Sequence, residues 1–167
     1  LVGPGIAKEI DNVHDFYRTW FNENGSPYWP YWDHIRSWWA CREAPNILLV
    51  HFNDLKADLA GNIRRIAGFL DIEQPDTTMD RIIEHCSFEY MKAHAELMAP
   101  AGGANWEGGA TTFINKGTNN RWRDVLSAQE IAAYEARALA ELGPECARWL
   151  EFGGRRFALP VVPSNMK

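Results

Sequence analysis

The sequence predicts an α/β fold that is mostly helical, with one clear strand of the parallel kind. The strand is Ile47 to Phe52, a nearly continuous apolar run typical of parallel strands that are covered on both faces. The residues after Asn53 and Asp54 form an apolar stripe at helical spacing: Leu55, Leu59, Ile63, Ile66, Leu70. A strand that leads directly into a long amphipathic helix is half of a βαβ unit. Because a parallel strand needs neighbours, further strands are expected from another segment or another copy.

Two helices are expected before the strand. The first spans residues 9–24 and ends at Gly25, and its apolar residues recur at helical spacing: Val13, Phe16, Tyr17, Trp20. The second begins near Pro30, which suits a first helical turn, and runs to about Arg42. Its apolar face is made of Ile35, Trp38 and Trp39.

Local capping signals predict the helices after the strand. Asp54 is expected to cap the long amphipathic helix, and Thr77 or Thr78 to open a short one. Ser87 suits the cap of the next helix, while residues 99–112 are expected to be irregular and mobile. Ser127-Ala128-Gln129-Glu130 is a capping box, and Gly143-Pro144 ends the helix that it opens. One more short helix is expected over residues 145–152.

Length and composition predict a single domain over residues 1–167. The net charge of −5 argues against a general nucleic-acid binder, which would present a basic face. No apolar run approaches the roughly 18 residues that span a bilayer, and no leader pattern of a basic and then an apolar segment is visible. Three cysteines at unrelated spacings fit a reducing compartment and show no zinc pattern, so we expect a cytoplasmic protein.

The loop from Phe113 to Thr118 carries the most chemical information. Its Lys116-Gly117 pair offers an anion a positive charge together with unobstructed backbone N–H groups. A solvated loop lysine is the alternative interpretation of Lys116. Upstream lie the apolar run with its amphipathic helix and the junction Cys86-Ser87-Phe88-Glu89-Tyr90-Met91.

In their order and spacing these segments resemble the C-terminal half of the cytosolic-type sulfotransferases, from about Val13 to about Gly143. That family transfers a sulfuryl group from 3′-phosphoadenosine 5′-phosphosulfate (PAPS) to a hydroxyl or amine acceptor. The resemblance therefore implies part of a P-loop-type three-layer fold, PAPS as co-substrate and a small-molecule acceptor. It also implies association with a complementary N-terminal half, or with a second copy.

The resemblance assigns nucleotide contacts to nine residues. Lys116 and Gly117 match the family's Arg-Lys-Gly element for the 3′-phosphate, and Asn115 replaces the Arg of that element, which removes a charge and a bidentate fork. The adenine side is matched by Cys86, Ser87, Phe88 and Met91, and further ring packing by Phe52 and Phe113. Taken from the residues alone, Phe88, Met91 and Phe113 suit packing in the core equally well, and Ser87 suits a helix cap.

The family's other catalytic parts are not matched. The phosphate-cradling loop, the histidine base and the Arg…Ser pair for the 3′-phosphate have no counterpart in this sequence, and no residue is assigned a catalytic role. His34 lies in a Trp-Asp-His segment that resembles a family pattern, yet the family's base belongs to the unmatched half. The sequence is thus expected to be a sulfotransferase fragment that is inactive by itself.

A function of another class stays open. Eight tryptophans could make a mostly helical, non-catalytic module whose aromatic surface binds an apolar ligand or a partner chain.

Overall fold

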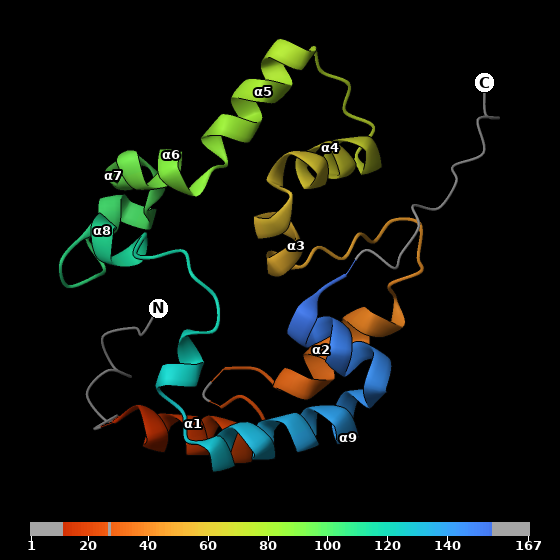
Figure 1. The fold of residues 1–167 in the computed structure, drawn as a ribbon, viewed down its shortest axis with the longest axis vertical. Coiled ribbons are helices and arrows are strands. Elements are labelled where there is room, and N and C mark those ends of the chain that lie inside the picture. The colour runs from red at the N-terminus through yellow and green to blue at the C-terminus, as the bar shows by residue number, and fades with distance from the viewer. Residues whose placement is uncertain (1–11, 27, 155–167) are drawn as a thin grey trace. The chain divides into compact units, whose positions relative to one another are not determined.

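The structure is a computed structural model that describes residues 12–26 and 28–154 (Figure 1). Every element in the described part of the chain is a helix. The contacts divide the chain into two compact units. Unit 1 holds the described residues up to Ile47 together with residues 120–153, and unit 2 holds residues 48–119 together with Gly154. The single domain over residues 1–167 stays a prediction.

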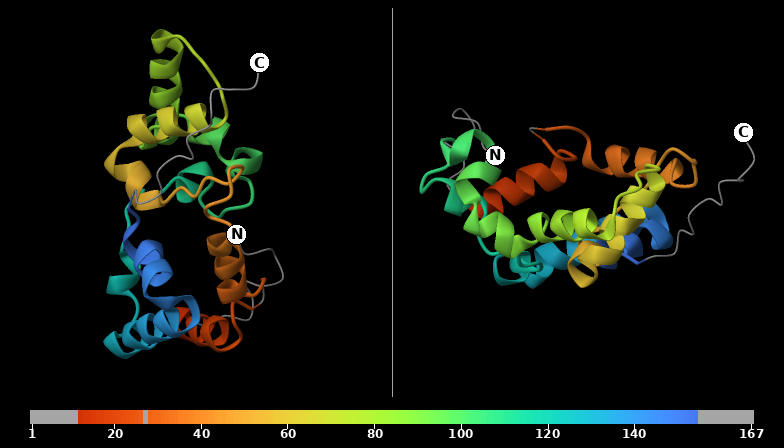
Figure 2. Two further views of the ribbon diagram at one scale, coloured as in Figure 1. Left: turned by 90° about the vertical axis from the view of Figure 1, so that its right-hand side faces the viewer. Right: turned by 90° about the horizontal axis from the view of Figure 1, so that it is seen from above.

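Unit 1 gathers segments that are far apart in the sequence. Its helices are α1 (Val13–Asn22), α2 (Tyr31–Ala40), the 3-10 turn η2 (Arg121–Asp124) and α9 (Ala128–Phe152). Figures 1 and 2 show α1 and α2 beside the long α9. The two predicted N-terminal helices are thus confirmed. Residues 9–11 of the first prediction lie outside the described part of the chain, and the second helix ends at Ala40 and not at Arg42.

Aromatic rings form the core of unit 1. Trp32 is 1% exposed, and the ring of Tyr31 lies 4.9 Å from it, edge to face. Tyr134 on α9 brings its ring centroid within 5.6 Å of Trp32, and Trp20 on α1 lies 4.8 Å from Tyr31. Cys146 is equally buried. Three helices therefore share one aromatic cluster, in which ring pairs add roughly 0.5–1.5 kcal/mol each beyond the area they bury.

The long helix α9 begins at the predicted capping box and bends where the sequence expects it to end. Ser127 Oγ accepts from the backbone N–H of Glu130, and the Glu130 carboxylate accepts in return from the Ser127 N–H at 2.9 Å. Gly143 has φ 74° and ψ 166°, a conformation that is essentially restricted to glycine, and Pro144 restarts the helix after it. The helix end expected at Gly143-Pro144 is present as a kink. The short helix expected over residues 145–152 is the second arm of α9.

Glu130 also joins α9 to α1, and this contact predicts a pH dependence. Its carboxylate lies 3.0 Å from His14 Nδ1, and the hydrogen bonds from Ser127 lower the pKa of Glu130 from 4.5 to about 2, with His14 adding to the effect. A depressed carboxylate pKa contributes stability above pH 4.5, and this contribution is lost as the pH falls toward 2. We expect the free energy of unfolding of Glu130→Gln, measured with urea from pH 7 to pH 2, to fall less steeply with decreasing pH than that of the native chain.

Glu135→Gln, on the same helix, is the control and should keep the pH dependence of the native chain. The same pH dependence in Glu130→Gln and the native chain would contradict the assignment.

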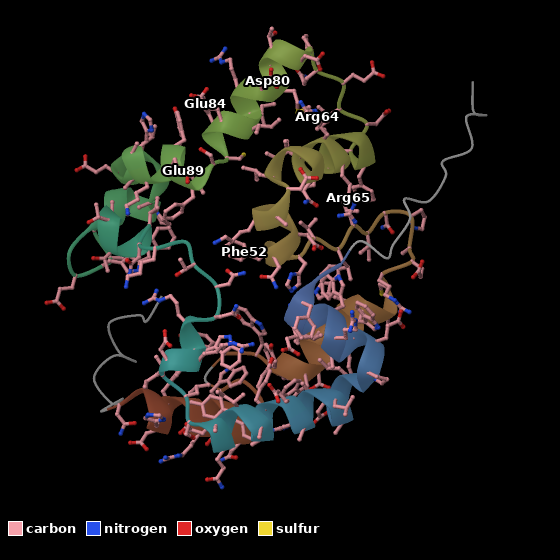
Figure 3. All side chains as sticks on the ribbon, viewed as in Figure 1. Phe52, Arg64, Arg65, Asp80, Glu84 and Glu89 are labelled. Carbon is pink, nitrogen blue, oxygen red and sulfur yellow. The ribbon has the colours of Figure 1, made fainter. Side chains whose placement is uncertain are left out.

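Unit 2 is a chain of short helices. In order they are α3 (Phe52–Ala57), α4 (Leu59–Phe69), α5 (Asp76–His85), α6 (Phe88–Ala93), α7 (Ala95–Met98), η1 (Pro100–Gly103) and α8 (Ala110–Phe113). Arg64 on α4 and Asp80 on α5 form an ion pair with 3.5 Å between charged atoms (Figure 3). Ala95, Ala99 and Ala110 pack together with Ile114 against them. Residues 99–112 were expected to be irregular, yet they contain η1 and the first three residues of α8.

The amphipathic stripe after residue 52 forms two helices instead of one. His51 caps α3 through Nδ1, which accepts from the Asn53 N–H at 3.1 Å, and Asp58 caps α4 by accepting from the Gly61 N–H at 2.8 Å. The prediction that Asp54 caps this helix was wrong: Asp54 lies inside α3, where its carboxylate accepts from the Gly154 N–H at 3.1 Å. The Asp58 side chain competes successfully for the helix start, so the chain breaks there.

The predicted strand over Ile47–Phe52 is not confirmed. Phe52 is the first residue of α3, and residues 47–51 belong to no helix, while no strand pairing occurs among residues 12–26 and 28–154. A strand is defined by its ladder, and here the Leu49 carbonyl accepts from Arg65 Nη2 at 3.3 Å instead. In the described part of the chain, no helix has the length and apolar character needed to cross a membrane.

Candidate functional site

The loop that follows α8 is fastened to α3 by two side-chain hydrogen bonds. The Lys56 ammonium donates to the Gly117 carbonyl, and the Asn119 amide donates to Asn53 Oδ1. Lys56 and Asn53 both belong to α3, so the short helix holds the loop at two points. The predicted Lys116-Gly117 element thereby has a defined position within unit 2.

Gly117 is held against the aromatic ring of Phe88. Its φ is 59°, in the left-handed region that favours glycine. A Cβ atom at this position would lie 2.6 Å from Phe88 Cδ2 and 3.1 Å from Phe88 Cγ, too close for any side chain. The loop backbone can approach Phe88 this closely only because residue 117 is glycine.

Phe88 is placed by the start of α6. Ser87 Oγ accepts from the Tyr90 N–H at 3.1 Å, so Ser87 is the helix cap that the sequence predicts and Phe88 is the first helical residue. Cys86 is an exposed free thiol at the end of α5. Met91 lies on α6 three residues after Phe88, on the same side of the helix, and is half-buried.

Three lysines from three segments lie near this ring and loop. Lys92 on α6 has its ammonium 5.8 Å from the centre of the Phe88 ring, Lys56 contacts Gly117, and Lys116 is exposed next to Gly117. Glu89, also exposed on α6, adds one negative charge (Figure 3). An aromatic face beside several ammonium groups suits a ligand that combines a planar ring with phosphate, because the ring stacks and the lysines meet the charge.

The two remaining predicted aromatic residues differ in their surroundings. Phe52 is 56% exposed at the start of α3 (Figure 3). It lies four residues before Lys56 and so shares its helix face. Phe113 is the last residue of α8, and its ring centre lies 4.4 Å from that of Trp106. Ile114 then anchors the chain to the alanine cluster, and Asn115 is exposed. The described structure thus gives Phe113 a packing partner of its own.

Sequence reasoning missed Lys56, Asn53 and Asn119 as parts of this site. The i,i+4 spacing of Phe52 and Lys56 was the available signal for Lys56. Asn119 carried no comparable signal, because its partner is 66 residues away. Within residues 12–26 and 28–154 no cluster of three His, Cys, Asp or Glu side chains is suited to hold a metal ion.

Comparison with known proteins identifies relatives of this chain. Residues 5–142 match the family model described as the sulfotransferase domain. Sulfotransferase 2A6 of Rattus norvegicus is 28% identical over 139 residues, which cover 78% of this chain and 45% of the relative. Sulfotransferase 1B1 of Mus musculus is 29% identical over 134 residues, covering 76% and 45%. The chain thus spans about half the length of the curated relatives that it matches.

A solved structure agrees with this result at the level of the fold. The crystal structure of mouse sulfotransferase SULT7A1 complexed with PAP superimposes with a TM-score of 0.71 at 19% identity, covering 89% of this chain and 53% of that one. The fold of the described chain is therefore that of part of a sulfotransferase. Because the family model covers most of the sequence, the chain belongs to the sulfotransferase domain family.

Proposed function

We propose that this chain is the nucleotide-binding, C-terminal half of a PAPS-dependent sulfotransferase, which transfers a sulfuryl group to a hydroxyl or amine of a small-molecule acceptor. The observation that carries the proposal is that Gly117 packs against the Phe88 ring while Lys56 donates a hydrogen bond to the Gly117 carbonyl. The match to the sulfotransferase family and the likeness to a sulfotransferase complexed with PAP support it.

The proposed division of labour follows from residue chemistry. Phe88, with Phe52 and Met91, would offer apolar surface to the adenine, and Ser87 would remain a helix cap beside it. Lys116 and the N–H groups around Gly117 would meet the 3′-phosphate, with Asn115 adding a neutral amide. Cys86 and Phe113 would border the slot. Binding is expected to be weak, because Asn115 brings neither the charge nor the fork of an arginine.

Transfer itself needs groups that we assign to no residue of this sequence. As the acceptor oxygen or nitrogen bonds to sulfur, the bond from sulfur to the phosphate oxygen of PAPS breaks, and a base takes the acceptor proton. We expect the 167-residue chain to lack this activity by itself. We further propose that residues 47–51 pair with strands of a complementary half, and that the complete enzyme works in the cytoplasm.

The test is nucleotide binding, measured by calorimetry with two ligands. We expect Lys116→Ala to weaken the binding of 3′,5′-adenosine bisphosphate about tenfold, since a charge-assisted contact contributes roughly 1.5–3 kcal/mol before solvent screening. Adenosine 5′-monophosphate lacks the 3′-phosphate, so its affinity should be the same for both proteins.

Arg81→Ala is the matched control, because Arg81 is an exposed cation on α5 of the same unit. It should leave both affinities unchanged. An equal loss for the two nucleotides in Lys116→Ala, or an equal loss in Arg81→Ala, would show that Lys116 acts only through general charge. If the native chain binds the bisphosphate and Lys116→Ala binds it equally well, the proposed phosphate site is wrong.

A further inference from the structure

We propose that unit 1 contains a separate ligand site for a neutral, flat, apolar small molecule. The residues proposed for the nucleotide all belong to unit 2, so this site involves none of them. The inference does not depend on sulfuryl transfer.

The site is a cavity of about 610 Å³ bounded by α1, η2 and both arms of α9. Its shape depends on the kink at Gly143, because residues before and after the kink line the same space. Cavities that take small organic ligands commonly measure about 300–1,000 Å³ and are mostly apolar with a few polar groups. The volume therefore suits a molecule with two or more fused rings.

The aromatic walls present ring faces, since the tyrosine hydroxyls are already engaged. Trp20 and Tyr134 both line the cavity, with ring centres 6.5 Å apart and planes 23° from parallel. The Tyr134 hydroxyl shares a 2.9 Å hydrogen bond with that of Tyr31, and the Tyr17 hydroxyl donates to the Glu130 carbonyl at 2.9 Å. A ligand here meets π surface and gains more from stacking than from hydrogen bonding.

Large apolar side chains that are left exposed gather in this cavity. Leu139 is 54% exposed, Phe152 56% and Trp122 36%, and all three line it. Covering apolar surface contributes about 25 cal/mol per Å² removed from water, so a ligand that covers these groups gains binding free energy. Concentrated apolar exposure of this kind marks an interaction site.

The charged groups of the lining argue against an anionic ligand. Arg148 contributes one positive charge, while Glu135 and Glu151 contribute two negative ones, so the set carries a net negative charge that disfavours an anion. No histidine is among the lining residues, and the carboxylates of Glu135 and Glu151 are the groups of the lining that can accept a proton. The apolar and aromatic walls hold a ligand by surface contact, so the ligand needs neither a charge nor a hydroxyl.

Naphthalene is the probe, because it has neither a hydroxyl nor an amine and cannot be sulfated. The indole N–H signals of the native chain are recorded in proton–nitrogen correlation spectra. Each signal is assigned to its tryptophan with Trp→Phe variants. We expect naphthalene to shift the signals of Trp20 and Trp122, which line the cavity, and to leave that of the exposed Trp29 in place. Uniform shifts of all indoles, or none, would overturn the proposal.

Leu139→Asp places a carboxylate in the wall at an exposed position and should weaken naphthalene binding at least tenfold. Leu97→Asp is the matched control, since Leu97 is 77% exposed on a helix of unit 2. Phe152→Ser provides a second variant at the end of α9 should Leu139→Asp unfold. Equal binding by the native chain, Leu139→Asp and Phe152→Ser would refute the site. A dimer in light scattering that naphthalene fails to dissociate would show that a second copy occupies it, and would equally overturn the proposal.

Discussion

Gly117→Ala is expected to lower the free energy of unfolding by about 2–4 kcal/mol and to abolish measurable binding of 3′,5′-adenosine bisphosphate. The first cause is the backbone, because φ 59° costs any residue with a Cβ roughly 1–2 kcal/mol. The second is the Phe88 ring, which the new methyl group would meet at 2.6 Å. Either Phe88 or the loop must move, and both belong to the proposed site. Urea unfolding and calorimetry measure the two effects.

Gly68→Ala is the control for this prediction. Gly68 lies inside α4 of the same unit, and an added Cβ would meet no atom within 4 Å. The same chemical change should there stabilise the helix by about 0.5–1 kcal/mol and leave binding unaltered. A Gly117→Ala protein as stable as the native chain would show that the loop does not rest on Phe88.

Asn62→Ala is expected to destabilise the chain by about 2 kcal/mol. Asn62 is 1% exposed, and its amide donates to the carbonyls of Asp54 and Asp58, each at 2.8 Å. These bonds join α3 to α4 across the break at Asp58, and α3 in turn holds the loop through Lys56 and Asn53. Removing the amide also leaves a small buried void.

The control is Asn105→Ala, since Asn105 is exposed in a turn of unit 2. Its effect should stay within about 0.5 kcal/mol. Urea unfolding of both variants measures the difference. If Asn62→Ala were as mild as Asn105→Ala, the joint between α3 and α4 would have to be held by other contacts.

Helix starts were predicted only in part: α5 begins at Asp76, after Pro75, and not at the predicted Thr77 or Thr78. Ser87 and Ser127 cap α6 and α9 as their sequences indicate, because a cap needs only a hydroxyl and the N–H groups two or three residues later. Asp54 failed as a predicted cap because two neighbours, His51 and Asp58, offered competing acceptors. The capping preferences of single residues do not decide which of several neighbouring acceptors bonds to the helix start.

The predicted strand shows a different kind of failure. The apolar run at residues 47–51 carries the correct pattern, yet a strand also needs a partner chain to supply its hydrogen bonds. The pattern describes burial, which a helix, a strand or an irregular segment can each provide. Pairing is a property of two segments and cannot be read from one.

The sequence by itself determined the family, the helical character of most segments and the caps Ser87 and Ser127, and it predicts a nucleotide-binding loop around Lys116 and Gly117. These follow from interactions within a few residues or from an ordered set of motifs. Only the tertiary structure decided that Gly117 rests on Phe88, that Lys56 and Asn119 fasten the loop, and that the kink at Gly143 bounds a cavity. Each of these contacts joins residues far apart in the chain or depends on a backbone angle. No local pattern specifies them, because they arise when separate elements pack to bury their apolar faces.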